Sequence, residues 1–162
     1  MLASAVPVLR TSDKLFASVA DTQTPQGIAA LVRPRQATIE SLLPETALLV
    51  VLVGVQDPGN VGTIVRAAEA FGATGAATCL ADGIGTADPF GPKALRASAG
   101  SALRLPIIHG ISPTILLAQL RMFRVKVYAA VVGAEESKNK TSDAASSLFC
   151  PWDIDWKTAA AI

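Results

Sequence analysis

The chain has 162 residues, of which 51% are apolar and 17% are charged. This is enough apolar material for one substantial core, and it excludes a disordered chain. The formal net charge of +1 excludes a basic surface over the whole molecule, so any affinity for nucleic acid must come from local patches. The longest apolar stretch, at 47–55, is shorter than the ~20 residues of a transmembrane helix, and the N-terminus does not fit a signal peptide. We therefore expect a cytoplasmic protein without membrane contact.

Potential metal ligands are few. The two cysteines, Cys79 and Cys150, lie far apart in the sequence, and His109 is the single histidine. A zinc site needs about four such ligands at close spacing. We therefore expect no metal site, and we expect both thiols to lie in the core.

The N-terminal part of the chain is predicted to contain one short helix and one strand. The spacing of Leu15, Phe16 and Val19 favours a short helix capped by Thr11 or Ser12, and residues 28–32 favour a strand. Two such elements cannot bury a core by themselves. Residues 1–36 are thus interpreted as the end of a small domain, and the polar stretch 37–47 as a linker.

Residues 48–162 alternate between strand and helix patterns. The aliphatic run at 48–53 is typical of a strand covered on both faces. Further strands are predicted near 76–80, 105–108, 125–132 and 157–162, with helices at 60–71, 92–97 and 112–123 between them. This order predicts an α/β fold with a mostly parallel sheet and flanking helices. The last strand is expected to form an apolar edge of that sheet.

The segment 54–73 carries the most informative pattern, a strand end, a tight turn and a helix. Asn60 is a suitable N-cap for this helix. Its apolar face is predicted to contain Val61, Ile64, Val65, Ala68 and Phe71. Arg66 falls on the opposite side, so packing does not require it.

Two general interpretations of this segment can be weighed from the residues alone. In the first, Arg66 is a solvated residue paired with Glu69 at i+3. In the second, Gly54 and Gly59 belong to a phosphate-binding loop of the G-x-x-x-x-G type. That loop requires a lysine followed by serine or threonine where this chain has Asn60 and Val61, so a nucleotide triphosphatase is disfavoured.

A family resemblance favours a third interpretation. The run Asp-Pro-Gly-Asn-Val-Gly at 57–62, with Arg-Ala-Ala at 66–68 and Ala-Phe-Gly-Ala at 70–73, resembles the first motif of SpoU (TrmH-like) RNA methyltransferases of the SPOUT superfamily. The segment 93–102, followed by Leu-Pro, is similar to the family's lysine-to-serine-glycine segment. Residues 24–28 resemble the end of its substrate-recognition domain.

The resemblance implies a SPOUT-like (α/β knot) fold and methyl transfer from S-adenosylmethionine to a ribose 2′-hydroxyl of tRNA or rRNA. Residues 1–36 would be the remnant of the N-terminal substrate-recognition domain, and 48–162 the methyltransferase domain. Family members continue past the strand that matches 158–162 into the knot, so we expect this chain to lack the C-terminal knot segment and part of the cofactor site. The alternative function is a non-catalytic RNA-binding or subunit-like remnant of the same fold. A homodimer is implied for the complete family protein, and this chain would lack much of that interface.

The resemblance also implies roles for individual residues. Arg66 occupies the position of the family's catalytic arginine, and Asn60 would position Arg66 or the ribose. Because an arginine side chain is a poor base, its more secure role is to hold the adjacent phosphate and to stabilise developing charge.

The remaining site predictions concern the cofactor and the RNA. The loop after strand 125–132 would contact the adenosine through Ala130, Val131 and Gly133. Lys93 and Arg96 share a helical face and are candidates for phosphate contacts, although a solvated basic face explains them equally well. Ser98 and Gly100 would shape the RNA pocket by close backbone approach, although a plain turn explains them equally well.

Overall fold

The first compact unit contains little regular structure. The structure is a computed structural model that describes residues 6–20, 22–35, 37–81, 83–130, 153–154, 156 and 158–162. The chain divides into two units, Met1–Arg33 and Pro34–Ile162. In the first, α1 (Asp13–Val19) begins after Ser12, whose hydroxyl accepts a hydrogen bond from the Leu15 N–H at 3.4 Å. The predicted strand at 28–32 is wrong, because no described segment pairs with it and its side chains are exposed.

The predicted linker is also corrected by the structure. Within 37–47, α2 (Ile39–Leu42) forms a helical turn whose N-cap is Thr38. Ile39 and Leu42 are buried, and the Thr74 hydroxyl donates a hydrogen bond to the Leu42 carbonyl at 2.9 Å. These contacts make α2 part of the second unit, because its two apolar side chains fill the core below the sheet.

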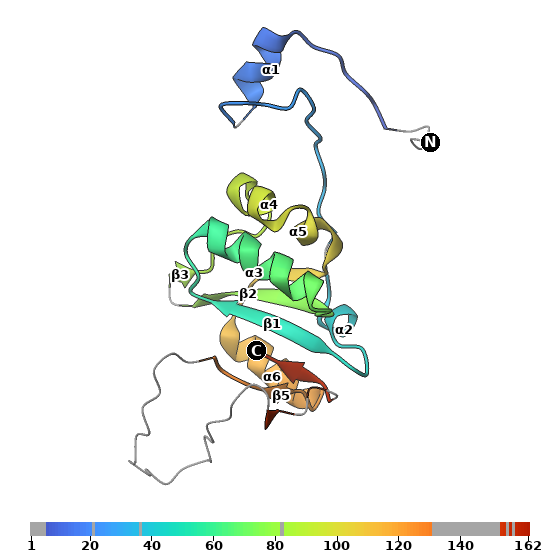
Figure 1. Cartoon of the computed structure of the whole chain (residues 1–162). Helices are drawn as coiled ribbons and strands as arrows, with labels where there is room; N and C mark the ends of the chain where they lie inside the picture. The colour runs from blue at the N-terminus through green and yellow to red at the C-terminus, as the bar shows by residue number, and fades with distance from the viewer. Residues whose placement is uncertain are drawn as a thin grey trace. The chain divides into compact units, whose positions relative to one another are not determined.

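The second unit is built on a six-stranded, mostly parallel sheet (Figure 1). The strands are β1 (Leu48–Val53), β2 (Gly75–Ala81), β3 (Ile84–Gly85), β4 (Ile107–Ile111), β5 (Lys126–Val127) and β6 (Ala160–Ala161). Neighbours follow the order β3-β2-β1-β6-β5, and β4 also pairs with β2. The pairing of β2 with β3 is antiparallel, and all the other pairings are parallel. The predicted α/β fold is therefore confirmed.

The position of the last strand differs from the prediction. β6 was expected at an edge, but it pairs with β1 on one side and with β5 on the other. The backbone of Ala160 is opposite both Leu48 and Lys126. An apolar strand is favoured in this interior position because both of its backbone edges gain hydrogen-bond partners.

Helices cover both faces of the sheet (Figure 1). On one face lie α3 (Pro58–Ala70), α4 (Pro92–Ser98) and α5 (Ser101–Arg104), and on the other lie α2 and α6 (Pro113–Met122). Leu52 of β1 packs in the first core with Val61 and Val65 of α3. Leu49 packs in the second with Leu116 and Leu120 of α6. Among the helices of the described segments, none is long and apolar enough to cross a bilayer.

Candidate functional site

Helix α3 begins before the residue that the sequence suggested. Its N-cap is Asp57, whose Oδ1 accepts a hydrogen bond from the Gly59 N–H at 3.1 Å. Pro58 takes the first helical position, where its missing N–H is not needed. Asn60 is therefore the third residue of the helix and not its cap, and its side chain is exposed.

Lys93 reaches from α4 to this N-cap. Its Nζ lies 2.6 Å from Oδ1 of Asp57, and both side chains remain exposed. The hydrogen bond from Lys93, followed by that from the Gly59 N–H, lowers the pKa of Asp57. The charge of Lys93 is thus already compensated within the protein. To contact an RNA phosphate with its full charge, Lys93 would have to leave Asp57.

Gly62 sets the distance between α3 and α4. A Cβ atom at this position would lie 2.3 Å from the Ala94 carbonyl oxygen and 2.7 Å from the Ala97 Cβ. Both neighbours belong to α4, so the two helices meet backbone to backbone at this point. The glycine at this place in the 57–62 run is explained by packing.

Ser98 has a structural role that does not fit the predicted RNA contact. The side chain is fully buried, and its hydroxyl donates to the Leu95 carbonyl at 2.9 Å and accepts from the Ala102 N–H at 3.4 Å. The reason is the turn between α4 and α5, in which Ala99 and Gly100 both have positive φ and turn the chain over Ser98. Arg96, on the same helix, is exposed and remains a candidate for RNA contact.

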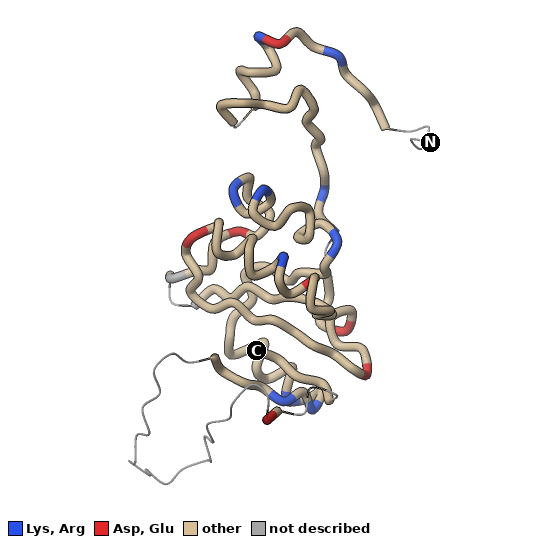
Figure 2. The backbone as a smooth tube through the Cα atoms, viewed as in Figure 1, with Lys and Arg blue, Asp and Glu red and all other residues tan. Residues whose placement is uncertain are grey.

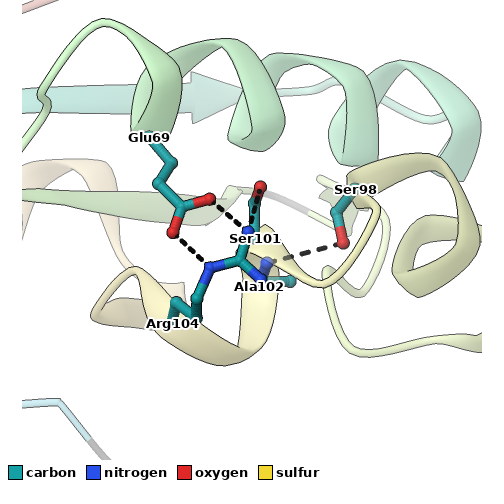
Figure 3. Close-up of polar contacts among 5 residues, drawn as sticks. All are labelled: Glu69, Ser98, Ser101, Ala102 and Arg104. Carbon is teal, nitrogen blue, oxygen red and sulfur yellow. Dashed lines mark hydrogen bonds and ion pairs between the residues drawn. The ribbon is translucent and has the colours of Figure 1, made fainter.

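Glu69 and Arg104 form a bidentate ion pair between α3 and α5 (Figure 3). Nε and Nη2 of Arg104 each donate to one carboxylate oxygen of Glu69 at 2.7 Å, and Nη2 also lies 3.3 Å from the Ser101 hydroxyl. The bonds from Arg104, and then that from Ser101, lower the pKa of Glu69 to about 2. No local pattern in the sequence indicates this pair, because its partners lie 35 positions apart.

Arg66 is not paired with Glu69. Its side chain is exposed, and it forms no hydrogen bond or ion pair with any residue that the structure describes. The i+3 carboxylate that could have neutralised it is held by Arg104 instead. The interpretation of Arg66 as one half of a surface pair is therefore wrong.

The carboxyl ends of the strands enclose an apolar cavity of about 430 Å³. It lies between β1, the chain at 127–130 and the first turns of α6. Sixteen residues line it, including Val53, Ile64, Tyr128 and Ala130. Val53 is 58% exposed for this reason, although the sequence predicted a strand covered on both faces. Ligands of open α/β sheets bind at this edge.

Arg66 does not face this cavity. Ile64 lines it, and Arg66 follows two residues later, about 200° around the helix axis. Asn60 and Arg66 are separated by about 9 Å along the helix. The structure therefore brings Arg66 neither to the cavity nor into contact with Asn60.

The residues present fit only one part of S-adenosylmethionine. The apolar walls suit an adenine ring, and Ala130 is on the cavity wall as predicted. No charged side chain is among the described lining residues, so the charged amino-acid end of the cofactor would find no ionic partner there. Val131 and Gly133, the other two predicted contacts, lie outside the described residues.

Comparisons with known proteins identify the family. The model of the SpoU rRNA Methylase family matches residues 47–157. The chain belongs to this family. It is 38% identical over 122 residues to the 23S rRNA (guanosine(2553)-2′-O)-methyltransferase RlmP of Bacillus subtilis, which covers 75% of this chain and 45% of that protein. The chain thus spans less than half the length of this SpoU relative.

Two solved structures of rRNA methyltransferases support the fold. The rRNA methyltransferase from Sinorhizobium meliloti matches with a TM-score of 0.74 and 26% identity, covering 93% of this chain and 52% of that one. The AdoMet-bound rRNA methyltransferase from the same organism matches with a TM-score of 0.55 and 28% identity, covering 72% and 43%. The α/β fold that the SpoU resemblance implied is confirmed.

Proposed function

We propose that this chain acts in RNA 2′-O-ribose methylation, with S-adenosylmethionine as the methyl donor. The family match, the rRNA methyltransferase relatives and the AdoMet-bound neighbour support this proposal. The structural observation that carries it is the state of Arg66. An exposed arginine in the family's first motif keeps its charge available, because the nearest carboxylate along the helix is bound by Arg104.

Arg66 is suited to binding the phosphate next to the target ribose. A guanidinium forms two parallel hydrogen bonds with a phosphate, which fixes the orientation of the adjacent sugar. Because Arg66 does not line the cavity, its part in the proposal is to hold and orient the RNA and not to contact the cofactor. The bound cofactor supplies the electrophilic methyl group.

The other predicted residues have supporting parts in this proposal. Asn60 presents an exposed amide on the first turn of α3, where it can hydrogen-bond RNA. Ala130 and the apolar cavity wall would hold the adenine ring of the cofactor. Arg96 would contact the RNA backbone, and Lys93 would do so after exchanging Asp57 for a phosphate. The resemblance also supports a homodimer for the complete family protein, and the composition supports a cytoplasmic location.

A methyl-transfer assay with radiolabelled S-adenosylmethionine tests the proposal. We expect transfer to ribosomal RNA and none to DNA of the same sequence, because only RNA has the 2′-hydroxyl. Arg66→Ala should reduce transfer by roughly 100-fold, as expected when a positioning contact is lost and the target ribose is misplaced by about 1 Å. Arg66→Lys, which keeps the charge but loses the bidentate geometry, should retain more activity.

Binding measurements distinguish this proposal from its alternative. Calorimetry should show that Arg66→Ala leaves cofactor affinity unchanged, since its proposed partner is the RNA. Equal losses of transfer and cofactor binding would contradict the assignment. RNA binding without any transfer by the wild-type chain would instead support the non-catalytic alternative.

A further inference from the structure

The positive charges of the second unit are segregated along the chain. Residues 37–88 contain six acidic side chains and a single cation, Arg66. Residues 89–130 contain no acidic side chain and six cations, which are Lys93, Arg96, Arg104, Arg121, Arg124 and Lys126. An acidic segment is thus followed by a basic one, and residues 131–162 are again acidic, with five acidic side chains and three lysines.

The fold neutralises only part of the positive charge of residues 89–130. Lys93 is paired with Asp57, and Arg104 with Glu69, so both cations of these pairs are locally neutralised. By contrast, Arg121, Arg124 and Lys126 are exposed, and their side chains form no hydrogen bond or ion pair with the described part of the chain. These three residues define the α6–β5 corner, where the helix ends and β5 begins (Figure 2).

Arg124 occupies a backbone conformation that disfavours it. It follows the end of α6 with φ +55°, and the Val125 N–H donates to the Leu120 carbonyl at 2.9 Å, as in a Schellman motif. Glycine is the usual residue at this position because any Cβ is strained there. At the end of α3, the equivalent position is Gly72, with φ +81°. An arginine at a strained backbone position indicates that its side chain has a function.

The surface around these cations also suits a nucleic acid. Met122 is 80% exposed and Phe123 45% exposed, both within the same turn. An exposed aromatic side chain beside cations is a platform on which a base can stack. Lys126 lies four residues before Ala130 of the cavity wall, a span of at most about 14 Å of extended chain. One RNA strand could therefore contact both regions.

We propose that the α6–β5 corner is a second RNA-binding surface, in which Arg121, Arg124 and Lys126 bind backbone phosphates. This inference rests on the proposed function for the identity of its polyanionic partner. It assigns the main phosphate contact to cations that have no partner among the described residues, and not to Lys93 or Arg104. The chemistry it recognises is a sugar-phosphate backbone without base sequence specificity.

The test is the salt dependence of binding to a short fluorescein-labelled RNA hairpin, measured by anisotropy. Arg121→Gln/Lys126→Gln should weaken binding about tenfold and reduce the slope of log affinity against log salt by about 2. The matched control, Arg121→Lys/Lys126→Arg, keeps a positive charge at both sites and should weaken binding less than about threefold.

Arg124→Gly provides a second, independent measurement. It should raise the melting temperature by about 2–4 °C, because glycine relieves the backbone strain, while it weakens RNA binding. A gain in stability together with a loss of affinity cannot result from misfolding. Stabilisation with unchanged RNA binding would overturn the proposal.

The remaining outcomes separate this inference from the proposed function. If the wild-type chain binds RNA through the corner but transfers no methyl group, the RNA-binding role of the corner is supported and the proposed methyl transfer is contradicted. If it transfers methyl groups and the corner variant binds RNA as the wild type does, only the corner is refuted. Three results would contradict the RNA-binding role of the corner. The wild type does not bind RNA, the control variant loses as much RNA affinity as the corner variant, or the chain binds polyglutamate in preference to RNA.

Discussion

Two cations of the α3–α5 surface, Lys93 and Arg104, differ from those of the α6–β5 corner in having a carboxylate partner. On the first surface, Lys93 caps the start of α3 through Asp57, and Arg104 binds Glu69. At the corner, three cations have no such partner among the described residues. The availability of a charge for an external ligand therefore depends on its neighbours in the fold. Counting lysines and arginines would have ranked helices α3–α5, which carry four, above the corner, which carries three.

The ends of α3 and α6 extend this comparison to the backbone. Both helices end in the same type of turn, with Gly72 after α3 and Arg124 after α6 in positive φ. Glycine adopts this conformation without strain at the end of α3. Arginine at the end of α6 lowers the free energy of unfolding by about 1 kcal/mol. The end of α3 therefore has the more stable turn, and the end of α6 exposes a charged side chain.

The largest effect on the α3–α5 surface is expected from Gly62→Ala. The new Cβ would clash with the backbone of Ala94, and we expect a loss of about 1–3 kcal/mol in the free energy of unfolding. Urea denaturation measures it. Gly59→Ala is the matched control, because its Cβ would come no closer than 3.2 Å to the Asp57 carboxylate. A neutral Gly62→Ala would show that α3 and α4 can separate at little cost.

Arg104→Ala should reduce methyl transfer by roughly tenfold. Without Arg104, Glu69 is free to pair with Arg66 at i+3, and this pairing would compete with phosphate for Arg66. The double variant Arg104→Ala/Glu69→Gln should recover most of the activity, since it removes the competing carboxylate. Failure of the double variant to recover would mean that Arg104 acts by holding α5 in place.

Gly72→Ala is the counterpart of Arg124→Gly at the other helix end. No atom lies within 4 Å of the added Cβ, so the effect comes from the backbone alone. We expect a loss of about 1 kcal/mol in the free energy of unfolding, because alanine is disfavoured at positive φ. Thermal melting of both variants would show changes of opposite sign. A change of the same sign would refute the comparison of the two helix ends.

The smallest expected effect is on stability in acid. Since the pKa of Glu69 is lowered to about 2 by Arg104, the unfolded chain binds the proton more tightly than the folded one. The ion pair therefore contributes fully above the ordinary glutamate pKa, and this contribution is lost as the pH falls from about 4.5 to about 2. The dependence of melting temperature on pH in this window should be shallower for Glu69→Gln. Identical profiles would show that solvent screening removes the contribution of the Glu69–Arg104 ion pair to stability.

The sequence determined the elements whose signal is local. The aliphatic run at 48–53 predicted β1 at its observed boundaries, because a continuous apolar segment of this length suits a strand between neighbours. The spacing of Val61, Val65 and Ala68 predicted the buried face of α3, although Phe71 at its end is 85% exposed. The first motif also predicted the family, since it combines a turn, a helix start and a polar side chain within one short segment.

Tertiary structure decided which partners these elements and side chains find. The strand at 28–32 is absent because a strand needs a neighbour, and β6 is interior because β5 pairs beyond it. Arg66 has no partner within the described segments because Arg104, distant in sequence, binds Glu69. Pairing, burial and charge compensation depend on residues that the fold brings together from far apart, and no local pattern in the sequence records them.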